Sequence, residues 1–490
     1  MHALRAQRQQ GGAGELAIVL HAHMPYVEGY GTWPFGEEWL HEAIARCYLP
    51  LLELLEEGAP LTLSLTPVLC DQLEAPGLAD RFKRFVREVR AHTHKEDACG
   101  LRAAGQPALA AELERCQREY EQAVAQLDAH QGDLLAALGP HVRFTSAATH
   151  AILPLVASDA LARVQVQSGV RAHRARFGAH WRGGFWLPEC AHAPHIEPIL
   201  AEAGARVVCV EWTQALGAGA IAHLRPYAGV GGLVLVPIDR LLIDRVWGAQ
   251  GYPAHGVYRD THRRTVHNHN PWANDGSAYD HDRALAQAQR DARDFAGALA
   301  ERLRAGCAAL GEGALVVVAA DAELFGLWWY EGVAFLRALA AECRQLGLTV
   351  AHLDQASALS APPAPLPSGA EGQAQEEARA GWPTSWGTAG DLRTWSTACA
   401  EVRAMASATR AAELELLRRG AAAGGVALRE LLALQASDWA FMVARGEALP
   451  YARERFAGHR RALCAALAGA PGPPPRNLAR FADVAMLELP

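Results

Sequence analysis

Short runs of apolar residues alternate with helical patterns along most of the chain. Eight of these runs have the length and composition of strands buried on both faces. They are Leu16–Leu20, Leu61–Leu65, Val142–Thr145, Gly184–Leu187, Arg206–Val210, Leu233–Ile238, Leu315–Ala319 and Leu348–His352. Between them lie patterns of helical period such as Glu37–Leu55, Arg283–Ala305 and Gly332–Leu346. Continuous apolar strands that alternate with helices are typical of a parallel sheet covered by helices.

Seven or eight such units favour a (β/α) barrel, complete or incomplete, with a doubly wound open sheet as the alternative. Two regions interrupt the alternation. Arg81–Leu138 is long and charged and predicts a helical insertion. Ala361–Gln373 is rich in Pro, Ala and Gly and predicts a linker or long loop. The later stretches Thr397–Arg419 and Val426–Arg445 predict a helical C-terminal part. We therefore expect a disordered tail at 1–14, a barrel at 15–375 with an insertion at 81–138, and a helical domain at 376–490.

Composition changes this picture little. The net charge of −7 argues against nucleic acid or an anionic membrane as the main partner. No run of eighteen apolar residues occurs, and Met1–Gly14 lacks the apolar core of a signal peptide. The ten cysteines contain no C-x-x-C pair, which indicates reduced thiols in a cytoplasmic enzyme.

Ionisable side chains follow three of the predicted strands. The first strand runs into His21-Ala22-His23, another is followed by Glu189, and a third ends in Asp321. The carboxyl ends of barrel strands share one face, so these groups can meet there. Cleavage of a glycosidic bond requires two carboxyl groups, one protonated and one ionised. Glu189 and Asp321 are therefore the candidate catalytic pair, and the alternative is that each carboxylate caps a helix or pairs with an arginine.

The histidines admit three interpretations. His21 and His23 have the spacing of a metal-binding pair, but they can also bind sugar hydroxyls or have only a structural role. On the assumption that only one of the two faces the barrel axis, the structural role is favoured. His150, just after the third predicted strand, carries the same ambiguity.

Aromatic residues add a second signal. The chain has 13 tryptophans, and several lie in polar contexts typical of loops: Trp33, Trp247, Trp272, Trp386 and Trp395. Indole rings stack on the apolar faces of sugars, although most tryptophans in proteins are buried anchors. The segment Trp328-Trp329-Tyr330 fits either description. The stretch from Trp247 to Asp280 is poor in aliphatic residues and predicts a loop that covers the site. No G-x-S-x-G, Walker or H-E-x-x-H motif occurs.

Together these segments resemble glycoside hydrolase family 57, in particular its 1,4-α-glucan branching enzymes. The stretches that carry the resemblance are LHAHMPYV, GTWPFGEEWL, AATHAILPLV, GGFWLPECA, DRVWGAQGYP, DAELFGLWWYEG, SWGTAGDLRTW and LLALQASDWAF. They run in the order of the family from residue 16 to about residue 450.

The resemblance implies an incomplete (β/α)7 barrel with a helical insertion and a C-terminal helical domain that contributes to the active site, without a metal or other cofactor. It implies that Glu189 is the nucleophile and Asp321 the general acid/base. It also implies that a further set of residues contacts the glucan: His21, His23 and His150 around the donor sugar, Trp33, Trp386 and Trp395 as platforms, Asp438 as a polar contact, and Tyr252 at the tip of a mobile loop. Trp272 lies in that same loop and is a further candidate.

The implied reaction cleaves an α-1,4-glucan and transfers the chain to a 6-hydroxyl, in a monomer or small homo-oligomer. Three alternatives stay open: a mainly hydrolytic α-amylase-type enzyme or 4-α-glucanotransferase, a metal-dependent hydrolase that uses His21 and His23, and a silent glucan-binding protein. The sequence departs from the family pattern at His192, Leu327 and Ala320, and at Glu211-Trp212-Thr213. These departures surround the two carboxylates and put the acceptor preference in doubt.

Overall fold

The computed structural model describes residues 14–31, 35–178, 180–311, 313–360, 362–365, 383–470 and 477–488. Three predictions lie wholly or mainly outside this part of the chain: the disordered tail, the linker at Ala361–Gln373 and the platform role of Trp33.

Seven parallel strands form the barrel. They are β1 (Glu15–Ala22), β2 (Leu61–Leu65), β3 (Val142–Ser146), β4 (Gly184–Trp186), β5 (Val207–Val210), β7 (Val234–Pro237) and β8 (Leu315–Asp321). Their hydrogen-bonded order is β7-β5-β4-β3-β2-β1-β8. The backbone N–H of Asp239, just after β7, donates to the carbonyl of Val317 on β8 at 2.8 Å. This bond joins the two ends of the sheet, so the predicted incomplete (β/α)7 barrel is confirmed and the open sheet is wrong.

Two very short strands lie outside the barrel path. β6 (Tyr227–Ala228) is antiparallel to β7, and β9 (Thr349–Val350) is parallel to β1. The predicted strand Leu348–His352 is thus reduced to two residues. The reason lies in β1, which pairs with β2 from Ile18 onward and leaves only Glu15 and Leu16 for β9.

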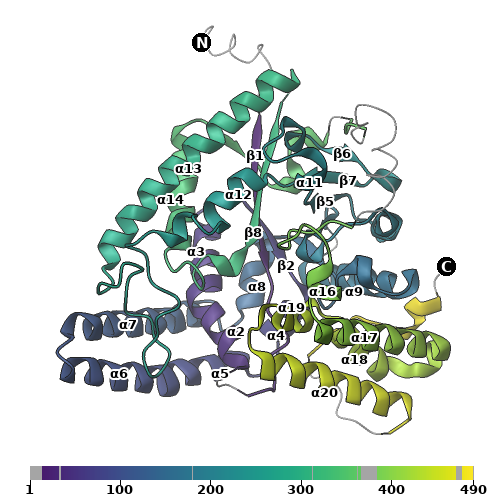
Figure 1. Ribbon diagram of the computed structural model, residues 1–490, viewed down its shortest axis with the longest axis horizontal. Coiled ribbons are helices and arrows are strands. Elements are labelled where there is room, and N and C mark those ends of the chain that lie inside the picture. The colour runs from purple at the N-terminus through teal and green to yellow at the C-terminus, as the bar shows by residue number, and fades with distance from the viewer. Residues whose placement is uncertain are drawn as a thin grey trace.

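Helices follow most strands and cover the barrel (Figure 1). They are α2 (Glu37–Ala43), α3 (Leu49–Glu56), α4 (Pro67–Leu73), α9 (Asp159–Phe177), α10 (Glu197–Glu202), α11 (Thr213–Leu216), α12 (Arg240–Trp247), α13 (His281–Leu310) and α14 (Gly332–Gln345). Several begin at a side-chain cap, because a short polar side chain satisfies a free backbone N–H of the first turn. Asp239 caps α12 by accepting from the N–H of Leu242, and Asp280 caps α13 in the same way.

The predicted insertion is helical. It contains α5 (Leu78–Arg84), α6 (Ala91–Ala103), α7 (Pro107–Ala129) and α8 (Leu134–Leu138), with a π-helical turn at Phe85–Arg90. The α6–α7 hairpin extends away from the barrel at the lower left of Figure 1. It turns at Gly105, whose φ of +73° is a conformation that glycine adopts without steric cost.

The C-terminal part consists of α16 (Arg393–Ser396), α17 (Ala400–Arg419), α18 (Gly424–Leu434), α19 (Ser437–Arg445) and α20 (Leu449–Leu467). The predicted helix Val426–Arg445 is two helices, with a break at Gln435 and Ala436. Ala436 forms a β-bridge with Ala151 of the loop after β3. This break brings the start of α19 to the mouth of the barrel. Among the helices of the described residues, none has the length and apolarity needed to cross a membrane.

Candidate active site

The two candidate carboxylates follow strands on opposite sides of the barrel mouth. Glu189 comes three residues after β4, and Asp321 is the last residue of β8. In the strand order, β1, β2 and β3 separate the two strands on one side and β5 and β7 on the other. Their charges still act on each other, because the carboxylate of Glu189 helps to raise the pKa of Asp321. The two carboxyl groups therefore lie near enough to each other for their charges to interact.

Hydrogen bonds fix both the side chain and the backbone of Glu189. The indole N–H of Trp386 donates to Oε2 at 2.8 Å, and the backbone N–H of Trp386 donates to the Glu189 carbonyl at 3.0 Å. Glu189, Cys190 and His150 all adopt a positive φ, between 48° and 60°. Non-glycine residues in this conformation are strained and concentrate at functional sites. Burial raises the pKa of Glu189 to about 7, although the Trp386 bond and the charge of His23 oppose this rise.

A chain of hydrogen bonds crosses the floor of the site. His21 Nδ1 lies 3.1 Å from the Ser64 hydroxyl, and His21 Nε2 lies 3.0 Å from His150 Nε2. His150 Nδ1 in turn lies 2.8 Å from the hydroxyl of Ser437 at the start of α19. Burial lowers the pKa of both histidines, and the charge of His23 lowers it further. Both imidazoles are therefore neutral at neutral pH and suited to hydrogen bonding.

His23 is in a different electrostatic state. Burial alone lowers its pKa, but the charge and hydrogen bond of Asp438 outweigh burial and raise it. Nε2 of His23 lies 2.8 Å from Oδ1 of Asp438, and Nδ1 lies 3.2 Å from the Thr66 hydroxyl. The ring also stacks on His150 with centroids 3.9 Å apart. This arrangement favours the protonated form of His23, and Asp438 supplies the negative charge that does so from the C-terminal part.

Asp321 lies beside a third carboxylate, Glu323. Glu323 accepts hydrogen bonds from the backbone N–H of His23 at 3.0 Å and the hydroxyl of Tyr48 at 2.6 Å. Burial, Glu189 and Glu323, in that order, raise the pKa of Asp321 well above its ordinary value. This setting favours the protonated form of the carboxyl group, which is the form that a general acid needs.

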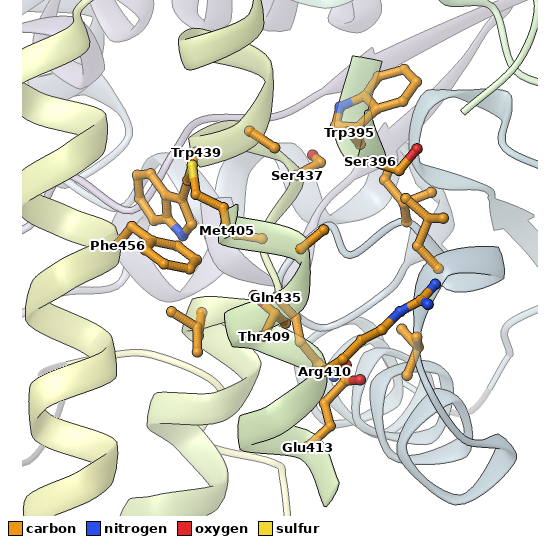
Figure 2. Close-up of a pocket in the computed structure, with 17 residues that line it drawn as sticks. Trp395, Ser396, Met405, Thr409, Arg410, Glu413, Gln435, Ser437, Trp439 and Phe456 are labelled. Carbon is orange, nitrogen blue, oxygen red and sulfur yellow. Dashed lines mark hydrogen bonds between the residues drawn. The ribbon is translucent and has the colours of Figure 1, made fainter. Parts of the chain in front are cut away.

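The candidate platforms differ in burial. Trp386 is partly buried and stands against Trp186, with ring centroids 5.1 Å apart. Trp395 is only 4% exposed, packs against Ile152 and Ala191, and lines a cavity of about 80 Å³ between the barrel and the C-terminal helices. Figure 2 shows Trp395, Ser437 and Trp439 around this cavity. In this conformation Trp395 is a packed anchor rather than an open face.

The predicted covering loop, Trp247–Asp280, is held against the insertion. Arg259 forms an ion pair with Glu112 of α7, and Asp97 of α6 binds both Thr265 and His267. Trp272 within it is 8% exposed beneath the guanidinium of Arg263.

Tyr252, near the start of this loop, packs on the outside of the barrel. Its ring lies against Phe295 of α13 and Phe335 of α14, and its hydroxyl donates to Asp294 at 2.6 Å. Among the contacts of the described residues, none joins Tyr252 to Glu189 or Asp321.

The four departures from the family pattern each have a structural place. His192 binds Glu197 at 2.9 Å and pairs with Thr384, so it anchors the segment that carries Trp386. Glu211 accepts from the N–H of Thr213 at 2.7 Å, next to α11. Leu327 packs against the core, and Ala320 borders a small apolar cavity.

Several residues at the site were not singled out by the sequence. They are Tyr48, Ser64, Thr66, Trp186, Glu323 and Ser437. Glu323 and Ser437 had a usable signal, because each lies within two residues of a candidate. Ser64 lies in β2, whose sequence is mostly apolar. Only its pairing with His21 of β1 reveals that it belongs to the site. Within the described ranges, no group of three or more His, Cys, Asp or Glu has the arrangement of a metal site.

The indole N–H of Trp386 supports a first prediction. Replacing Trp386 by phenylalanine removes a donor that stabilises the ionised form of Glu189, so the pKa of Glu189 rises. If Glu189 is the nucleophile, activity requires its ionised form, and we expect the acid limb of the pH profile to move to higher pH by about one pH unit. The measurement is kcat/KM on amylose against pH. Trp395→Phe is the matched control, because the buried N–H of Trp395 has no hydrogen-bond partner. If Trp386→Phe and Trp395→Phe had the same pH profile, the indole N–H of Trp386 would not be the donor that stabilises ionised Glu189.

Comparisons with known proteins agree with this geometry. The profile of Glycosyl hydrolase family 57 matches residues 17–363, and that of the 1,4-alpha-glucan branching enzyme C-terminal region matches residues 395–469. The chain is 31% identical to the 1,4-alpha-glucan branching enzyme of Thermococcus kodakarensis over 91% of its length and 72% of that protein. It is 30% identical to a probable 1,4-alpha-glucan branching enzyme of Mycobacterium tuberculosis, over 92% and 91% of the two chains.

Two solved structures have the same fold as this chain. The branching enzyme of Pyrococcus horikoshii superposes with a TM-score of 0.82 at 28% identity, over 91% of this chain and 88% of that one. The α-amylase AmyC of Thermotoga maritima, at 22% identity and a TM-score of 0.75 over 97% and 96%, shares the fold.

Proposed function

The chain belongs to glycosyl hydrolase family 57, and from this premise we propose that it is a 1,4-α-glucan branching enzyme. It cleaves an α-1,4-glucan and transfers the released chain to a 6-hydroxyl of another glucan. The observation that carries the proposal is the pair of carboxyl groups at the ends of β4 and β8, with the pKa of Asp321 raised by burial and then by the charges of Glu189 and Glu323. The second matching profile, at residues 395–469, supports the same proposal from the C-terminal part of the chain.

The first half of the reaction breaks the α-1,4 bond. The carboxylate of Glu189 attacks the anomeric carbon while Asp321 gives its proton to the oxygen of the departing chain. The products are a shortened glucan and a glycosyl ester on Glu189. Trp386 fixes one oxygen of Glu189 by its 2.8 Å hydrogen bond and so aims the other at the sugar. Asp438 favours the protonated form of His23, and the charge of His23 in turn favours the ionised form of Glu189.

The second half forms the branch. Once Glu189 is an ester, its negative charge no longer raises the pKa of Asp321, so Asp321 becomes a stronger acid and remains ionised as a base. It accepts the proton of an incoming 6-hydroxyl, whose oxygen attacks the anomeric carbon and displaces Glu189. The bond that forms is α-1,6, and both carboxyl groups return to their starting states. Water in place of the 6-hydroxyl gives a shortened chain instead.

The donor sugar is bound by neutral groups. His21 and His150 are bonded to Ser64, to Ser437 and to each other, so their orientation is set before the sugar arrives, and a sugar hydroxyl that binds either Nε2 replaces the bond between the two rings. Such pre-ordered groups recognise hydroxyls without a charge that would attract ions. The α19 helix contributes Ser437 and Asp438 directly, which makes the C-terminal part a component of the site.

Linkage analysis tests the proposed function. Amylose incubated with the protein should gain α-1,6 linkages, seen as new anomeric proton signals by NMR, with few new reducing ends. A mainly hydrolytic enzyme would produce reducing ends without α-1,6 signals, and a 4-α-glucanotransferase would change chain lengths without either. Either result would replace the proposed acceptor while the pair of carboxyl groups kept its role.

The compartment follows from the cysteines. No disulfide joins the ten cysteines, all of which lie within the described residues. This supports a reducing environment, and we place the enzyme in the cytoplasm as part of the proposal.

A further inference from the structure

Two large aromatic side chains face solvent side by side. The indole of Trp247 is 44% exposed and that of Trp328 is 54% exposed, with ring centroids 5.9 Å apart and planes inclined by 47°. Three other tryptophans, Trp186, Trp329 and Trp439, are fully buried. Adjacent exposed indoles are unusual on a protein surface and mark binding sites more often than isolated ones.

Trp328 belongs to the turn that follows Asp321. The backbone N–H groups of Leu327 and Trp328 both donate to the carbonyl of Glu323, at 3.2 and 3.4 Å, and the N–H of Trp329 donates to Leu324. Trp329 is buried at 1% exposure and fixes the turn in the core. Trp328 is thereby presented outward on a rigid support, seven residues after the candidate acid/base.

Trp247 reaches the same place from the other neighbouring strand. It is the last residue of α12, the helix that begins just after β7. Trp247 and Ala320 border one small apolar cavity, and Ala320 directly precedes Asp321. At the opposite end of α12, Arg240 donates to the carbonyl of Trp386 at 3.4 Å. The helix thus runs from the side of Glu189 to the side of Asp321, with the exposed indole at the Asp321 end.

The location of Trp247 and Trp328 near Asp321 indicates which part of the substrate they contact. If the proposed reaction is correct, Asp321 protonates the departing chain and later deprotonates the acceptor, so both chains occupy the Asp321 side in turn. We propose that Trp247 and Trp328 form a platform for the glucan chain on this side, departing chain first and acceptor second. The inference deepens the proposed function and depends on it.

The chemistry of the pair suits an α-glucan. Each indole offers a flat apolar face to the C–H face of a glucose ring. The inclination of 47° between the two planes fits a curved chain such as an α-1,4-glucan better than a flat ribbon.

The test uses Trp247→Ala, Trp328→Ala and the double variant of the full chain. The donor is an α-maltosyl fluoride, and the measured quantity is the initial rate of transfer against maltoheptaose concentration. We expect each single variant to raise the KM for maltoheptaose about 3- to 10-fold and the double variant to raise it further. Release of fluoride in the absence of acceptor should stay within about twofold of the wild type. Leu414→Ala, which removes an apolar side chain of 53% exposure on α17, is the matched control.

An unchanged KM for maltoheptaose in the double variant, with transfer intact in the wild type, would overturn this inference and leave the proposed function standing. Absence of transfer to any glucan acceptor by the wild type would instead remove the proposed function. Sedimentation tests the remaining explanation, which is that the two indoles form a contact between subunits. A wild type that is dimeric and a double variant that is monomeric, with equal acceptor KM, would mean that the two indoles form a subunit contact, and that result would also overturn the inference.

Discussion

The Glu189→Gln variant is expected to lose at least about 10⁴-fold in turnover of amylose while still binding it. The amide has nearly the shape of the carboxylate, so the hydrogen bond from Trp386 can be kept by a rotated side chain. It lacks the negative charge that attacks the anomeric carbon, and the glycosyl ester cannot form. The loss should therefore appear in kcat, with KM changed little. The measurement is the initial rate of amylose conversion, together with quenching of tryptophan fluorescence by maltoheptaose as a check on binding.

Glu211→Gln provides the matched control for this prediction. Glu211 also follows a barrel strand and is buried at 6% exposure, but its described hydrogen bond is to the backbone of Thr213. We expect its turnover to remain within a few fold of the wild type. A Glu189→Gln variant that kept more than about a tenth of wild-type turnover would mean that the nucleophile is another group. Comparable losses in both variants would mean that strand-end carboxylates act through folding rather than chemistry.

The Asp321→Asn variant should show a loss that depends on the leaving group. Departure of a glucan chain requires a proton, so turnover of amylose should fall by about 10²- to 10⁴-fold. Departure of fluoride requires far less help, so the first step with an α-maltosyl fluoride should stay within about tenfold of the wild type. The second step still lacks its base, so a burst of fluoride should precede a slow steady rate. Rapid-mixing measurement of fluoride release separates the two steps.

Equal losses on amylose and on the fluoride would contradict an acid/base role for Asp321. They would indicate that the side chain binds or positions the sugar instead. The melting temperature adds an independent readout, because the folded protein keeps Asp321 protonated at a pH where the unfolded chain ionises it. Ionisation of this buried group costs stability as pH rises above its ordinary range. Asp321→Asn should therefore melt at a higher temperature than the wild type at neutral pH and approach it near pH 4.

The barrel strands were predictable because burial on both faces leaves a continuous apolar run. Leu61–Leu65 coincides with β2, and Leu315–Ala319 lies within β8. Closure of the barrel was not predictable, because it depends on the contact of Asp239 with Val317, 78 residues apart in the printed sequence. The helical break at Ala436 was also hidden, since its cause is the bridge to Ala151 and not a local helix breaker.

The candidate site likewise has parts that the sequence could predict and parts that it could not. Strand-end position alone led to Glu189 and Asp321, since it follows from the apolar runs. The structural role favoured for His21 and His23 assumed that only one of them faces the barrel axis. That assumption was wrong, because residues two apart along a strand point to the same face, and both rings lie near His150. The burial of Trp395 and the outward packing of Tyr252 depend on helices far away in sequence, so their platform and loop roles stay predictions.

The central claim is that Glu189 and Asp321 act on opposite sides of one sugar, and the stalled Asp321→Asn variant tests it most directly. After reaction with an α-maltosyl fluoride, the protein is digested and the sugar-bearing peptide is identified by mass spectrometry. The account predicts one maltosyl group, attached as an ester to Glu189 in the segment GGFWLPECA. A sugar attached to any other residue, or a burst of fluoride that leaves no sugar on the protein, would contradict it.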